Sequence, residues 1–198
     1  MPDTSVLSTA ARNADASDSA ERPNLASAVG SVARMLDPDT KDSKKKLPSG
    51  DRAALRRINT DAPVTPALWK VLHHLGIPDP DPQYDTSEAR HERNWGLLLM
   101  GMAHCAGLHD YDVPLGKALA LAGWSELRFT RLMEADNETL PALMRRMAQY
   151  LASKQQPANW ADVAYLLFTR DSEKMEATRL DIARAYYSTL YQQEQDDS

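Results

Sequence analysis

The sequence is poor in cysteine, glycine and phenylalanine, with one, eight and two of these residues among 198. A single cysteine excludes an internal disulfide and any zinc site built on several cysteines. No apolar run approaches the roughly 20 residues that a membrane-spanning helix requires. The first residues also lack the charged and apolar regions of a secretory signal. We therefore expect a cytoplasmic protein with no membrane partner.

Motifs of catalysis are also missing. The sequence has no phosphate-binding G-x-x-x-x-G-K-[ST], no G-x-G-x-x-G and no G-x-S-x-G elbow. His73 and His74 are consecutive, so on a helix they point about 100° apart and cannot easily share a metal. His104 and Cys105 lie in an apolar helical stretch, where burial is the ordinary explanation. We expect no enzyme, no metal site, no cofactor and no small-molecule substrate.

Apolar residues recur at the three- and four-residue spacing of helices, and no run alternates with the period of two that strands show. The sequence therefore predicts an all-α fold. Residues 1–23 lack periodicity, and Lys44–Lys46 form a basic linker, so we assign residues 1–48 to a flexible extension. Within it, the apolar stripe at residues 24–36 predicts a short helix. The helices predicted beyond it span residues 52–58, 67–75, 86–108, 115–122, 126–135, 138–153, 160–168 and 172–193.

Arginines and lysines on the helix surfaces are the candidates for binding. The net charge is −5, and residues 1–49 hold seven of the 23 bases and seven of the 28 acids. Contact with nucleic acid therefore needs a local basic patch. Surface arginines usually serve only solubility and weak ion pairs, but two arginine doublets lack an adjacent acid, and guanidinium groups suit phosphate oxygens. The candidates are Arg52, Arg56, Arg57, Arg128, Arg131, Arg145, Arg146, Lys154 and Arg170.

The stretch 115–132 also has the outline of a helix-turn-helix, with two helical segments joined by a short turn after Gly123. In that arrangement Glu126, Arg128 and Arg131 would read base edges in the major groove. Many helical hairpins share this length and glycine placement. Two further functions therefore stay open, a transcription regulator of helix-turn-helix type and a helical adaptor that binds only protein.

Two sequence blocks carry a resemblance to a known family. They are GDRAALRR at residues 50–57 and LGKALALAGWSELRFTRLMEAD at residues 115–136, followed by LMRR at 143–146 and NWAD at 159–162. The longer block is similar to the pattern L-G-R-A-L-A-x-S-G-x-S-E-x-R-F-x-R-L-L-x-A-D. The chain thereby resembles the CasB family, the small subunit of the type I-E CRISPR surveillance complex Cascade, over about residues 49–190.

The resemblance implies a non-catalytic protein of two small helical bundles, here residues 49–113 and 114–198. It also implies two head-to-tail copies beside the repeated backbone subunit and the large subunit of Cascade, where they hold the guide RNA–target DNA hybrid and the displaced strand. Arg57, Arg128, Arg131 and Arg146 fall in the family's basic motifs, and Arg170 in a loop where relatives often have a base. Glu134 stands where members often carry arginine, and Asn137 where some do, which predicts a thinner or displaced basic path.

Overall fold

The protein is all-α over the residues that the computed structural model describes, which are 25–41, 46–59, 65–77, 85–169 and 172–196. No β-strand occurs in these ranges, so the predicted fold class is confirmed. None of the helices described is both long and apolar enough to cross a membrane. The helices are α1 (Leu25–Leu36), α2 (Ser49–Arg56), α3 (Pro66–His74), α4 (Asp85–His104), α5 (Leu115–Leu121), α6 (Glu126–Met133), α7 (Leu140–Ser153), α8 (Trp160–Phe168) and α9 (Ser172–Asp196).

Helix α4 is the centre of the molecule. It packs against α1, α2, α7 and α8, and its residues 95–103 are buried without interruption. A stretch that is apolar on all sides is stable only when other helices surround it, as the sequence predicts. The predicted end at Leu108 is wrong by four residues. The helix ends at His104 because the chain turns at Gly107, whose φ of +82° lies in the left-handed region.

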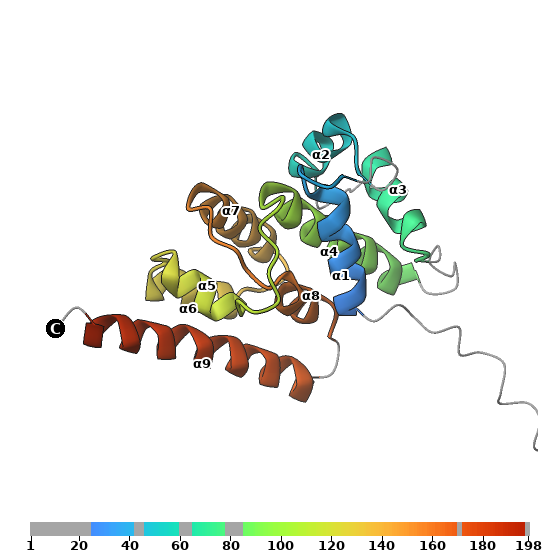
Figure 1. Cartoon of the computed structure of the whole chain (residues 1–198). Coiled ribbons are helices and arrows are strands. Elements are labelled where there is room, and N and C mark those ends of the chain that lie inside the picture. Colours follow the sequence, from blue (N-terminus) through green and yellow to red (C-terminus); the bar gives the residue numbers. More distant parts are fainter. Residues whose placement is uncertain (1–24, 42–45, 60–64, 78–84, 170–171, 197–198) are drawn as a thin grey trace, which may run out of the picture.

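Helix α1 corrects the predicted N-terminal extension. Val29, Val32 and Leu36 are almost completely buried, and the helix packs against α8 and α4 (Figure 1). The short helix predicted at residues 24–36 is therefore confirmed. Its apolar stripe packs on a partner surface, so the assignment of this helix to a flexible extension is wrong. Residues 1–24 and the lysines Lys44 and Lys45 lie outside the described residues. The ammonium of Lys46 donates to the carbonyl of Pro38.

Helix α9 runs along one side of the molecule against α5 and α8 (Figure 1). Its inner face buries Ile182 and Tyr186. The Tyr186 ring stacks on Phe129 of α6 at a centroid distance of 4.0 Å, and the Tyr186 hydroxyl donates to the carbonyl of Trp124. These contacts join α9 to the segment that contains the longest sequence motif. The division into bundles at residues 49–113 and 114–198 stays a prediction, since buried side chains of both segments form one continuous cluster.

The ends of the helices follow local rules in part. Asn159 caps α8, because its side-chain oxygen accepts a hydrogen bond from the Ala161 amide at 3.0 Å. Asp162 accepts from the first amide of α5, that of Leu115, at 2.8 Å. Helix α2 begins at Ser49, three residues before the predicted start. Asp51 lies in its first turn, and the Asp51 carboxylate pairs with Lys70 of α3 at 2.8 Å.

Candidate nucleic-acid interface

The doublet Arg145-Arg146 on α7 divides into two different environments. The two terminal nitrogens of Arg145 donate to the carbonyl oxygens of Arg56 and Ile58, each at 2.9 Å. The Arg56 carbonyl is at the end of α2, where helix geometry leaves oxygens without helical partners, and the Ile58 carbonyl lies two residues beyond that end. Arg145 is half-buried and Arg146 is exposed. Arg145 therefore joins α7 to α2, while Arg146 stays available at the surface.

Arg52 has a similar place in the fold. It is half-buried, and its Nη1 donates to the carbonyl of Leu36 at 3.2 Å, at the end of α1. A cation is stabilised there by the carbonyl end of the helix dipole. Two of the nine candidates therefore hold helix ends together through their guanidinium groups.

A first group of exposed bases stands where α2 ends beside α7. Arg56 and Arg57 are exposed at the end of α2, and Arg146 is exposed on the neighbouring α7. We call these three residues the α2–α7 patch. The pKa of the half-buried His104 is lowered by burial and by the positive charges of Arg145 and Arg56, although the Arg56 carbonyl acts in the opposite direction. The patch therefore derives its charge from arginines.

A second group joins the start of α6 to the end of α7. The guanidinium carbon of Arg128 lies 5.4 Å from the Trp124 ring centroid and 6.0 Å from that of Tyr150. The Nζ of Lys154 lies 5.8 Å from the same Tyr150 centroid. Both cations are exposed. Two candidates that are 26 positions apart in the sequence therefore meet at one aromatic ring.

Arg131 and Arg170 complete the predicted set. Arg131 is exposed on α6, as are Glu126 and Arg128, whereas Phe129 and Leu132 of the same helix are buried. The exposed side of α6 is therefore the one that the helix-turn-helix interpretation requires, and it equally suits contact with a nucleic-acid backbone. Arg170 lies outside the described residues.

The structure also brings in residues that the sequence interpretation missed. Trp124 and Tyr150 carry the cations of the second group, and each stands four positions before its partner, Arg128 or Lys154. This spacing was visible in the sequence. Arg93 of α4 donates from Nη2 to the carbonyl of Asn137 at 2.7 Å. A base from another helix thus reaches the segment in which Glu134 and Asn137 depart from the family pattern.

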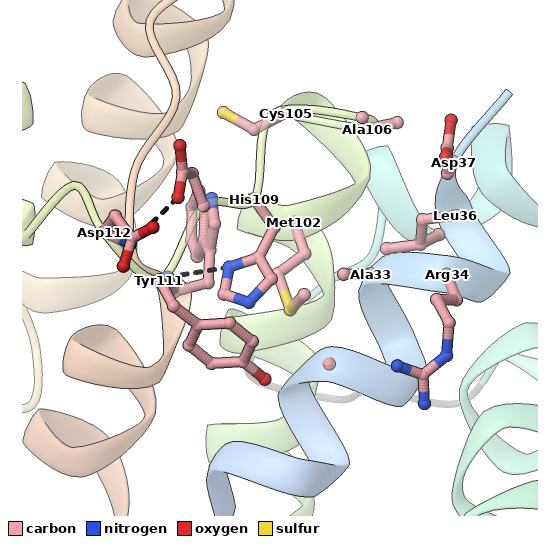
Figure 2. A pocket seen from close by; sticks show the side chains of 14 residues that line it. Ala33, Arg34, Leu36, Asp37, Met102, Cys105, Ala106, His109, Tyr111 and Asp112 are labelled. Atoms are coloured by element: carbon pink, nitrogen blue, oxygen red, sulfur yellow. Dashed lines mark hydrogen bonds between the residues drawn. The ribbon is translucent and has the colours of Figure 1, made fainter. Parts of the chain in front are cut away.

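A cavity of about 350 Å³ lies between α1 and the loop that follows α4 (Figure 2). Its polar lining includes Asp37 and Asp110, whose side chains accept hydrogen bonds from the amides of Asp39 and Asp112 at 2.8 and 2.9 Å. His109 accepts from the Trp160 amide through Nδ1 at 3.3 Å. Within the described ranges no three His, Cys, Asp or Glu side chains gather as metal ligands do. The aspartates of the cavity therefore stabilise the turns of the chain that line it.

Two histidines predict how stability depends on pH. Burial lowers the pKa of His104 and of His109 below the usual 6.5. The unfolded chain therefore takes up protons first as the pH falls, so the free energy of unfolding should decrease as the pH falls through 6.5. We expect a lower urea midpoint at pH 5.5 than at pH 7.5, measured by circular dichroism.

A matched pair of variants checks this explanation. The double variant His104→Gln and His109→Gln should lose most of the pH dependence. Replacing the exposed His73 and His74 by glutamine should leave the dependence intact. A pH dependence that survives in the first double variant would show that other groups cause it.

Comparisons with known proteins agree with this fold. The family described as CRISPR-associated protein Cse2 matches residues 51–187. M. ruber CasB has 23% sequence identity and a TM-score of 0.63, over 86% of this chain and 98% of that chain. A chain of E. coli Cascade bound to a PAM-containing dsDNA target has 19% identity and a TM-score of 0.59, over 82% and 96%. CasB from Thermobifida fusca has 16% identity and a TM-score of 0.59, over 82% and 95%. No curated protein matches the chain.

Proposed function

Because the chain belongs to the family of CRISPR-associated protein Cse2, we propose that it is the non-catalytic small subunit of a type I-E Cascade complex in the cytoplasm. Its partners are then the repeated backbone subunit, the large subunit, a second copy of itself, the guide RNA and the target DNA. The family match over residues 51–187 is the observation that carries this proposal.

The work proposed for the protein is retention of the nucleic-acid backbone. In guide-directed complexes base pairing reads the sequence, while the protein needs only to hold the hybrid and the displaced strand. Exposed cations perform that task without a base-reading scaffold. The α2–α7 patch and the second group supply these cations, and Arg131 adds one more cation on α6. The net negative charge is compatible with this, since a local stripe is sufficient.

Co-purification with candidate Cascade subunits and guide RNA tests the assignment directly. We expect a stable complex that contains this chain. The isolated chain should bind nucleic acid weakly and without sequence preference, and log affinity should fall with log salt by about 0.7–0.9 per phosphate contact. Nanomolar preference for one palindromic duplex would favour the helix-turn-helix regulator. Absence of salt-dependent binding, alone and in the complex, would favour the adaptor.

The neighbours Arg145 and Arg146 provide a matched test of site assignment. Arg145→Gln should lower the free energy of unfolding by about 2–4 kcal/mol, because the carbonyls of Arg56 and Ile58 both lose a charged donor. Arg146→Gln should leave stability within about 0.5 kcal/mol and should reduce the salt slope of binding by about one phosphate contact. Urea unfolding and fluorescence anisotropy with labelled DNA measure the two effects. If both variants behave alike, the division of the doublet is wrong.

A further inference from the structure

The cations of the second group are held by aromatic rings where surface cations commonly pair with carboxylates. Arg128 lies over Trp124 and Tyr150, and Lys154 over Tyr150, at the distances of cation–π contacts. Neither cation has a carboxylate partner within the part of the chain that the structure describes. By contrast, Lys70 and Arg184 each pair with an aspartate, at 2.8 and 2.9 Å.

The two aromatic rings are themselves fixed in place. The Tyr150 hydroxyl lies 3.0 Å from the carbonyl oxygens of Ala122 and Gly123, to which it donates. The Trp124 and Tyr150 rings meet edge to face, with centroids 5.1 Å apart. Trp124 is 4% exposed, and its buried indole nitrogen has no acceptor among the described residues. The position of Trp124 therefore depends on contacts of its ring. The Tyr150 contacts attach the turn before α6 to α7.

This arrangement matters because the two kinds of contact use different parts of a cation. A guanidinium group stacks through its face, while its N–H donors lie at the edge. A carboxylate partner would occupy that edge. An aromatic partner leaves it open to phosphate oxygens. Both charges lie within 6.0 Å of the Tyr150 centroid, so the two cations share one aromatic partner.

We propose that Trp124 and Tyr150 are positioning residues, which form a platform that orients Arg128 and Lys154 toward the phosphates of a nucleic-acid strand. This inference rests on the proposed function and deepens it. The platform holds two long side chains in place before the strand arrives, which reduces the entropy lost on binding. It also links α6 to α7, so the two cations keep a constant relation to each other.

Replacement of Tyr150 in the full-length chain tests the platform. The probe is a labelled single-stranded DNA oligonucleotide, and its binding is measured by fluorescence anisotropy across a salt series. Urea unfolding first shows that each variant is folded under these conditions. Tyr150→Leu should lower affinity about tenfold and decrease the salt slope by about 0.7–1.4, corresponding to one or two phosphates on a single strand. Tyr150→Phe loses the hydroxyl contacts but keeps the ring, so it should lose stability and retain the wild-type slope.

A double-mutant cycle separates positioning from a general effect on structure. The variant Arg128→Gln with Lys154→Gln should bind as weakly as Tyr150→Leu, and the combination of all three changes should bind no more weakly. Full additivity would overturn the proposal, because it would mean that the ring acts apart from the cations. Lys70→Gln with Arg184→Gln, on α3 and α9, is the control for loss of two exposed charges and should bind like the wild type.

Arg128→Lys gives an independent answer if Tyr150→Leu does not fold. It keeps the charge on an exposed helix surface and loses the planar guanidinium group that lies over both rings. We expect a several-fold loss of affinity, and wild-type affinity would overturn the platform. The two proposals fail differently. A wild-type chain with no salt-dependent binding, alone and in the assembled complex, would overturn the proposed function together with the platform, whereas wild-type binding that Tyr150→Leu leaves unchanged would overturn the platform alone.

Discussion

Gly116→Ala should destroy the packing of α5 against α9. A Cβ at this position would lie 1.9 Å from the carbonyl oxygen of Ile182 and 2.8 Å from the amide nitrogen of Tyr186. Both are backbone atoms of α9, so no side-chain rotation relieves the clash and the helices must separate. Overpacking usually costs about 1–3 kcal/mol, and we expect more than about 3 kcal/mol here. Urea unfolding followed by circular dichroism measures the loss.

Gly50→Ala is the matched control for this prediction. A Cβ on Gly50 meets no heavy atom within 4 Å, and the residue lies in the first turn of α2. Alanine is favoured over glycine in a helix by about 1 kcal/mol, so this variant should be as stable as the wild type or slightly more stable. If Gly116→Ala is likewise stable, α5 and α9 do not cross as closely as the structure shows.

Gly116 illustrates what the sequence reveals about the fold. Local periodicity predicts a helix over 115–122, and the structure has α5 there. The close crossing was not predictable, because the partner atoms belong to residues 182 and 186 and nothing near position 116 indicates them. Helix α1 has the same explanation. Its apolar stripe is visible, but only α8 and α4 make it part of the core.

The candidate site also contains some residues whose role can be predicted from local spacing and others whose role depends on distant partners. Arg145 and Arg146 are equivalent in sequence, since both follow Met144 and precede Met147. Their roles differ because the carbonyl partners of Arg145 are 87 and 89 positions away, a distance at which residue spacing carries no information. The aromatic platform, in contrast, left a local signal, the four-residue spacings from Trp124 to Arg128 and from Tyr150 to Lys154.

Reversing the charge of Arg128 and Arg146 together should have the largest effect on binding. The double variant Arg128→Glu and Arg146→Glu removes one cation from each exposed group and adds two repulsive charges. We expect the assembled complex to retain target DNA about 10–100-fold less well, with a shallower dependence on salt. The melting temperature should change little, because both side chains are exposed and the cation–π contact contributes only about 0.5–1 kcal/mol.

A control with the same change in net charge distinguishes a local path from overall charge. Lys70→Glu with Arg184→Glu alters two exposed bases that already pair with carboxylates, on α3 and α9. Target DNA should be retained nearly as well as by the wild type. Equal losses in the two double variants would mean that net charge alone governs retention. If the Arg128–Arg146 variant unfolds, these arginines are needed for stability, and their assignment to binding is wrong. Only a loss of target-DNA retention that is confined to the folded Arg128–Arg146 variant places the nucleic-acid backbone across α6 and α7.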